Sequence, residues 1–148
     1  MKGAIICIGN RLVAEDAAGM AVFDQLRARD GLPAEVTVIE GGLAGLNLLP
    51  LLEQGGRVVF VDAVQGFTRP GEMVLLDRQQ IVNTLGGGYF DHGSGLAYVL
   101  SVLPQVCDGD LPEEIVLVGL EGECTLPTIK RAAELSITLA THGLKERT

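Results

Sequence analysis

The sequence predicts an α/β protein, a three-layer α/β/α sandwich with a mostly parallel, doubly wound sheet of about five strands. Apolar runs of strand length alternate with amphipathic stretches of helix length, which is the pattern of βαβ units around a parallel sheet. The continuous Val-Val-Phe-Val run within residues 57–61 suits a strand that is buried on both faces. With 148 residues, 47% of them hydrophobic, the chain can bury one core, so we expect a single domain over residues 1–148.

The first half of the chain alternates strands and helices. Residues 4–8 are apolar and predict the first strand. Residues 16–29 carry Met20, Phe23 and Leu26 at helical spacing before Asp30-Gly31 ends the helix. Strands follow at residues 36–39 and 57–61, with a short apolar helix at residues 45–52 between them.

The second half of the chain continues this alternation. A turn at residues 66–71 leads to an edge strand at residues 73–76, and residues 79–88, polar and then glycine-rich, have the composition of a surface loop. A helix at residues 95–106 and a core strand at residues 114–118 come next. The closing helix is predicted at residues 128–139, with Thr125 or Thr128 as its cap and Gly143 just past its end.

Composition excludes several classes of protein. A net charge of -8, from 19 acidic and 11 basic residues, argues against a nucleic-acid binder, which needs a basic face. Gly9-Asn10-Arg11 interrupts the first apolar run, so we expect neither a signal peptide nor a membrane span, and a cytoplasmic location. Cys7, Cys107 and Cys124 are odd in number and widely spaced, which fits reduced thiols better than disulfides or a structural zinc site. Cys7 is expected in the core.

The candidate site consists of Asp16, with Glu15 beside it, Asp62 and His92. In an open parallel sheet, ligands bind beyond the carboxyl ends of the strands, where the loops bearing these residues are predicted to meet. Two carboxylates and an imidazole suit a divalent transition metal. Each residue also has an ordinary structural explanation: Asp62 could form a cap or turn, Glu15 and Asp16 could complement a helix dipole, and His92 could bond a backbone carbonyl.

Other kinds of site find less support. Gly9, Gly41-Gly42 and residues 86–88 allow close backbone approach near the expected site, but their spacing makes neither a dinucleotide fingerprint nor a phosphate-binding loop. Ser94 follows His92 too closely to infer a catalytic triad. His142, near the C-terminal end, is expected to interact with a helix terminus or with water.

Five ordered motifs spanning nearly the whole chain carry a family resemblance. The chain resembles the hydrogenase maturation endopeptidases in these segments: Ile8-Gly9-Asn10-Arg11-Leu12, Glu15-Asp16-Ala17-Ala18-Gly19, Glu40-Gly41-Gly42-Leu43-Ala44-Gly45, Val61-Asp62-Ala63 and His92-Gly93-Ser94-Gly95-Leu96. After Val118-Gly119 the family usually carries a longer loop before its final helix, and this chain is shorter there. The shortening concerns substrate docking and leaves the proposed metal ligands in place.

The resemblance implies a specific activity. Members of this family remove a C-terminal peptide from the large-subunit precursor of a nickel-iron hydrogenase after nickel insertion. By this resemblance, Asp16, Asp62 and His92 would be both the catalytic residues and the ligands of nickel, which the substrate supplies, and the precursor is the expected partner. Glu15 and Glu40 are second-rank candidates for tuning the site or binding the substrate tail. We expect a monomer or a weakly associating protein that binds neither nucleic acid nor membrane.

Two alternatives remain open at this stage. One is an assembly chaperone that has kept the site and lost proteolysis. The other is a receiver domain of phosphorelay signalling, which also has an acidic pair after its first strand and an Asp ending its third. Residues 9–14 separate Glu15 and Asp16 from the first strand, and no lysine follows the last strand, so the receiver interpretation fits less well.

Overall fold

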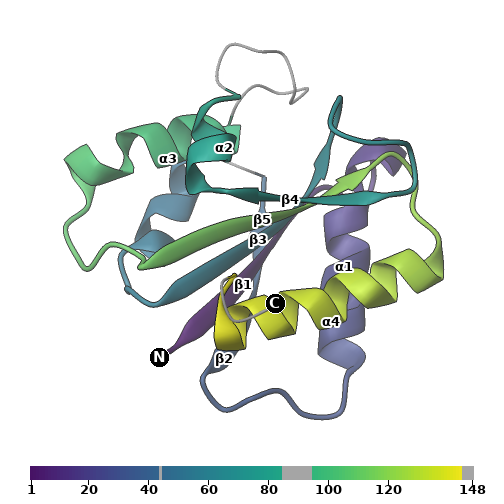
Figure 1. Ribbon diagram of the computed structural model, residues 1–148, viewed down its shortest axis with the longest axis horizontal. Helices are drawn as coiled ribbons and strands as arrows, with labels where there is room; N and C mark the ends of the chain where they lie inside the picture. Colours follow the sequence, from purple (N-terminus) through teal and green to yellow (C-terminus); the bar gives the residue numbers. More distant parts are fainter. Residues whose placement is uncertain (44, 85–94, 145–148) are drawn as a thin grey trace.

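A five-stranded sheet organises the computed structural model, which describes residues 1–43, 45–84 and 95–144 (Figure 1). The strand order is β2-β1-β3-β5-β4. The strands are β1 (Gly3–Ile8), β2 (Val36–Gly42), β3 (Arg57–Val64), β4 (Met73–Asp77) and β5 (Glu114–Glu121). All neighbouring strands are parallel except β4, which pairs antiparallel with β5. The mostly parallel sheet and its edge strand near residues 73–76 are therefore confirmed.

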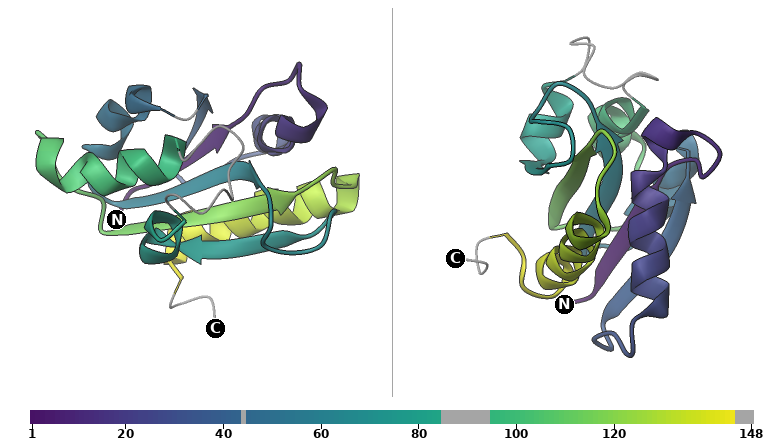
Figure 2. Two further views of the ribbon diagram at one scale, coloured as in Figure 1. Left: turned by 90° about the horizontal axis from the view of Figure 1, so that it is seen from above. Right: turned by 90° about the vertical axis from the view of Figure 1, so that its right-hand side faces the viewer.

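Helices cover both faces of the sheet (Figures 1 and 2). On one face lie α1 (Ala18–Ala28) and α4 (Leu126–His142). On the other lie α3 (Gly95–Val106), α2 (Arg78–Val82) and the 3-10 helix η2 (Leu46–Leu52). A second 3-10 helix, η1 (Ala14–Asp16), precedes α1. This arrangement confirms the predicted α/β/α sandwich.

The alternation of side chains along β3 divides the core into two clusters. Val59 and Val61 pack with α1 and α4, whereas Val58, Phe60 and Val64 pack with α3 and η2. Successive side chains of a strand point to opposite faces. Asp62 therefore points to the face that α3 covers.

Asp62 lies inside a strand, and the prediction that β3 ends before it is wrong. β3 continues to Val64 because β5 pairs with it throughout, Asp62 opposite Gly119 and Val64 opposite Glu121. A charged residue after an apolar run normally signals the end of a buried strand. Here backbone pairing with β5 extends the strand beyond the apolar run.

Two predictions about helices also need correction. The first helix begins at Ala18, and Asp16 lies in η1 instead. Within the predicted loop at residues 79–88, α2 forms because the Asp77 carboxylate accepts the Gln80 backbone N–H while the Gln80 side chain accepts the Asp77 N–H. The helix over residues 95–106 is confirmed, whereas residues 86–88, His92 and Ser94 lie outside the described residues.

Candidate functional site

The turn between β1 and α1 folds Asp16 back onto the end of the sheet. The backbone N–H of Asn10 donates to the carbonyl oxygen of Asp16 at 3.0 Å. Gly9 has a φ of 154°, and a Cβ there would collide with this same carbonyl. A Cβ at Gly19 would likewise collide with the carbonyl oxygen of Ile8, so α1 starts in close contact with the end of β1. These approaches leave Asp16 half-buried beside the carboxyl edge of the sheet.

Asp62 is a buried carboxyl group next to Asp16. Asp62 is only 7% exposed, and its Oδ1 accepts a hydrogen bond from the Ala63 backbone N–H at 2.8 Å. Burial, followed by repulsion from the Asp16 carboxylate, raises the pKa of Asp62 well above its usual range, and the Ala63 hydrogen bond opposes this shift. The structure thus brings two of the three predicted site residues together.

The third predicted residue, His92, lies outside the described residues. The first residue of α3 is Gly95, which follows His92 closely in the chain, and α3 packs on the face to which Asp62 points. Within residues 1–43, 45–84 and 95–144, no group of three or more histidine, cysteine, aspartate or glutamate side chains could hold a metal ion. Asp16 and Asp62 could supply two oxygen ligands, and the part played by His92 stays a prediction.

The second-rank candidates, Glu15 and Glu40, are exposed. Neither is among the causes of the raised pKa of Asp62. Glu40 acts instead on Cys7, whose pKa rises to about 12 through burial first, then Asp24 and then Glu40. Cys7 is fully buried and stays a protonated thiol, which confirms its expected place in the core.

Glu121 is a buried acid near the site that the sequence interpretation did not single out. It is 8% exposed, and its carboxylate accepts backbone N–H groups from Gly66 at 3.0 Å, Phe67 at 3.0 Å and Thr68 at 3.2 Å. Glu121 ends β5 opposite Val64, so it fixes the turn that leaves β3 just after Asp62. Its sequence signal was an acidic residue directly after the apolar run of the last strand.

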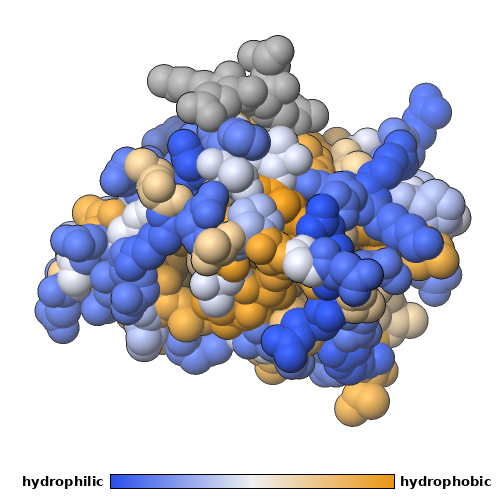
Figure 3. Space-filling view, turned by 90° about the horizontal axis from the view of Figure 1, so that it is seen from below, coloured by the Kyte–Doolittle hydropathy of each residue, from blue (hydrophilic) through white to orange (hydrophobic). Residues whose placement is uncertain are grey.

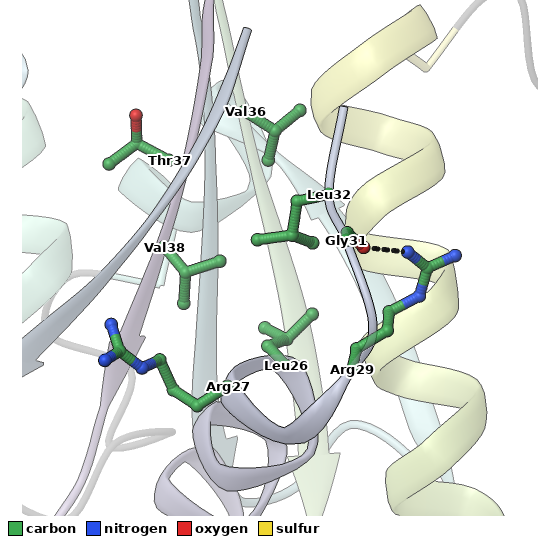
Figure 4. Close-up of a pocket in the computed structure, with 8 residues that line it drawn as sticks. All are labelled: Leu26, Arg27, Arg29, Gly31, Leu32, Val36, Thr37 and Val38. Carbon is green, nitrogen blue, oxygen red and sulfur yellow. Dashed lines mark hydrogen bonds between the residues drawn. The ribbon is translucent and has the colours of Figure 1, made fainter. Parts of the chain in front are cut away.

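A shallow pocket with a volume of about 400 Å³ lies away from these acids (Figure 4). It is formed by the end of α1, the following loop and the first half of β2, and its lining residues are Leu26, Arg27, Arg29, Gly31, Leu32, Val36, Thr37 and Val38. Val36, which lines the pocket, pairs with Gly3 at the start of β1. Asp62 lies toward the other end of the strands, because it directly follows Val61, the partner of Cys7 near the end of β1. The pocket therefore belongs to the opposite edge of the sheet from Asp62. On the face of the molecule that is seen from below in Figure 3, apolar surface gathers between hydrophilic side chains.

A pair of neighbouring carboxyl groups, one buried, can perform two kinds of chemistry. A carboxyl with a raised pKa can hold a proton near neutral pH and deliver or accept it during a reaction. The same two groups can ligate a divalent cation once the proton leaves. Both uses require the substrate to reach the carboxyl edge of the sheet.

The fold and the acidic pair define an α/β protein whose candidate site lies at the carboxyl ends of its parallel strands. None of the described helices is long and apolar enough to cross a bilayer. Comparison with known proteins then identifies the family. The sequence profile of the hydrogenase maturation proteases matches residues 20–141, a span that includes Asp62 and His92 and begins after Asp16.

Individual relatives agree with this match. The hydrogenase 2 maturation protease of Escherichia coli strain K12 is 31% identical over 130 residues, covering 87% of this chain and 78% of that protein. The hydrogenase expression/formation protein HupD of Bradyrhizobium diazoefficiens is 27% identical over 150 residues, covering 96% and 77%. The structure of the E. coli hydrogenase maturating endopeptidase HybD superimposes with a TM-score of 0.76 at 27% identity, covering 99% and 94%. The chain belongs to the hydrogenase maturation protease family, and it is a hydrolase of the endopeptidase class.

Proposed function

We propose that this protein removes the C-terminal extension from the nickel-loaded large-subunit precursor of a nickel-iron hydrogenase, and that Asp16, Asp62 and His92 engage the nickel. One observation supports the proposal most strongly. In a chain of this family, the half-buried Asp16 lies beside the buried Asp62 at the carboxyl edge of the sheet. Two such acids next to each other are costly in the free protein, which suggests that they are kept for binding or catalysis.

Nickel is part of the substrate in this proposal, and it changes the state of the acids. In the free protein, burial and Asp16 favour the protonated form of Asp62. An approaching cation favours the ionised form, so binding of the loaded precursor would release the proton. Two carboxylates and an imidazole leave coordination positions for the ligands that already hold the nickel. A precursor without nickel would lack this anchor and would leave the proton on Asp62.

Cleavage requires that the scissile bond be held near these acids. Once the nickel is engaged, it can orient the bond, polarise the carbonyl or activate water. Asp16 or Asp62 can act as the general base, because both lie at the edge where the substrate must enter. Cys7 is excluded as a nucleophile, since it is fully buried and its thiol stays protonated.

A cleavage assay tests the proposal directly. The purified protein is mixed with a large-subunit precursor, with and without nickel, and the loss of the C-terminal extension is followed by mass. We expect cleavage only with nickel, and a loss of rate of about a hundredfold or more in Asp16→Asn, Asp62→Asn and His92→Ala. Asp30→Asn is the matched control, because Asp30 is exposed in the loop after α1. Normal cleavage by Asp62→Asn and His92→Ala would refute the site assignment.

The same assay separates the alternatives. Binding of the loaded precursor without loss of its extension would identify an assembly chaperone. The receiver alternative loses its support, because the family match covers most of the chain and its relatives are proteases. The monomeric state and the cytoplasmic location expected from the sequence stay predictions.

A further inference from the structure

Four exposed apolar side chains lie on the segments that directly follow β1 and β2, the last of them at the start of η2. Leu12 is 93% exposed, Leu43 64%, Leu46 57% and Val13 38%. We call these four residues the apolar rim. β1 and β2 are neighbours, and the Gly9 N–H donates to the Gly42 carbonyl at 3.0 Å, so both loops start from one point at the carboxyl edge.

Hydrogen bonds hold the first loop in the conformation that exposes Leu12. The Leu12 backbone N–H donates to Oδ1 of Asn10 at 2.9 Å. The Arg11 guanidinium binds both carboxylate oxygens of Asp24 on α1, at 2.6 and 2.8 Å. A leucine held outward by such contacts is available to a partner without further ordering of the loop.

The second loop is also tied to the sheet. The Asn47 side-chain amide donates to the Gly41 carbonyl at 3.3 Å, close to Leu46 in the chain. Leu48 and Leu52 of the same 3-10 helix are fully buried, whereas Leu46 faces solvent. Leu46 is therefore exposed, although Leu48 and Leu52 of the same helix pack in the core.

Part of the apolar rim lies directly before Asp16 in the chain. Leu12 and Val13 precede η1, which carries Asp16, and the Asp16 N–H donates to the Val13 carbonyl at 2.9 Å. A protein substrate that reaches Asp16 must therefore lie against this loop. Four side chains are also far fewer than the roughly 20 to 30 residues that each partner contributes to a stable interface, so the rim suits a transient encounter better than a permanent dimer.

We propose that the apolar rim is the docking surface for an apolar segment of the precursor beside the scissile bond. This inference rests on the proposed function and adds to it, because it assigns substrate affinity to residues outside the acidic site. Burial of exposed leucines against apolar groups strengthens binding without touching the reacting atoms. Removing these leucines should therefore weaken binding and leave the chemical step intact.

Steady-state cleavage of the nickel-loaded precursor tests the inference. For the double variant Leu12→Ser/Leu46→Ser we expect KM to rise about tenfold, with kcat within twofold of the wild type, since two apolar contacts are lost. Leu111→Ser is the matched control, because Leu111 is also exposed but precedes β5 at the opposite edge of the sheet. Its KM and kcat should both equal those of the wild type. Both substituted leucines are solvent-exposed, so circular dichroism spectra should be unchanged.

The outcomes distinguish this inference from the proposed function. If the wild type cleaves the precursor and the double variant keeps a KM within twofold of it, the rim is not the docking surface and the proposed function stands. An equal loss in Leu111→Ser would also overturn the inference. If light scattering shows a wild-type dimer that the double variant disrupts, the rim joins two copies of this chain and the inference is wrong. If the wild type cleaves nothing with or without nickel, the proposed function itself fails.

Discussion

At the scale of single residues, the molecule places two acids of different character side by side. Asp62 is buried within β3, and Asp16 is half-buried in η1. Burial of Asp62 costs free energy when it is ionised, and the nearby negative charge of Asp16 adds to that cost. Such a pair is stabilised by a proton or by a bound cation.

The raised pKa of Asp62 predicts a pH dependence of stability. The unfolded chain loses this proton at about pH 4, whereas the native state keeps it to a higher pH, so the free energy of unfolding should fall as pH rises between the two pKa values. Asp62→Asn cannot ionise and keeps the acceptor for the Ala63 N–H. Without nickel, it should be more stable than the wild type above this window and equally stable below it. Urea unfolding from about pH 4 to pH 8, followed by circular dichroism, measures the difference.

The comparison with Asp30→Asn shows whether the effect belongs to the buried acid. Asp30 is exposed, so its variant should follow the wild-type curve. If Asp62→Asn and the wild type have the same dependence on pH, the Asp62 pKa is not raised in the folded protein.

At the scale of elements, one carboxylate connects β5 to the turn that follows β3. Glu121 accepts three successive backbone N–H groups from Gly66, Phe67 and Thr68. Its own backbone pairs with that of the connection to β4, because Gly71 donates to the Glu121 carbonyl and the Glu121 N–H donates to Glu72. The end of β5 therefore determines the path of the chain just after Asp62.

Replacement of Glu121 by glutamine should loosen this turn. Glutamine has one acceptor oxygen in place of two, and its amide nitrogen would face backbone donors. We expect the free energy of unfolding to fall by about 1–3 kcal/mol and the amides of residues 66–68 to exchange faster with solvent. Urea unfolding and hydrogen exchange measure the two effects.

Glu123 provides the control, since it is exposed two positions further along. Glu123→Gln should change stability by no more than about 0.5 kcal/mol. Unchanged exchange at residues 66–68 in Glu121→Gln would show that the carboxylate does not hold the turn.

At the scale of the whole molecule, one sheet is shared by two apolar clusters. The cluster beneath α1 and α4 and the cluster beneath α3 and η2 both include side chains of β1, β3 and β5. Loss of packing on one face removes support from strands that also form the other face. The two faces should therefore unfold together.

Truncation of one leucine on each face tests this coupling. Leu100 on α3 and Leu139 on α4 are fully buried, and each change to alanine should lower the free energy of unfolding by about 2–5 kcal/mol. Each variant should still unfold in a single urea transition, with exchange of the β3 amides accelerated in both. Leu126→Ala, at an exposed position, should stay within about 0.5 kcal/mol of the wild type. Two separate transitions in either variant would show that the faces are independent.

The sequence by itself determined the order and type of most elements and indicated the two acids of the candidate site. Alternating apolar runs and helical spacing are local properties, so the parallel strands, the edge strand and the helix at Gly95–Val106 could be predicted from short windows of the chain. Asp16 and Asp62 could be chosen because acids near the carboxyl ends of parallel strands share one edge of the sheet.

Only the tertiary structure decided the environment of these acids and the partners of Glu121. Strand pairing with β5 placed Asp62 inside β3, where burial by residues distant in the sequence raises its pKa. The three backbone donors to Glu121 come from residues more than fifty positions earlier in the chain. Arg11, the neighbour of the exposed Leu12, is likewise held by Asp24 of α1, thirteen positions further along the chain. Burial, pKa and exposure are sums over neighbours in space, and a local pattern does not specify those neighbours.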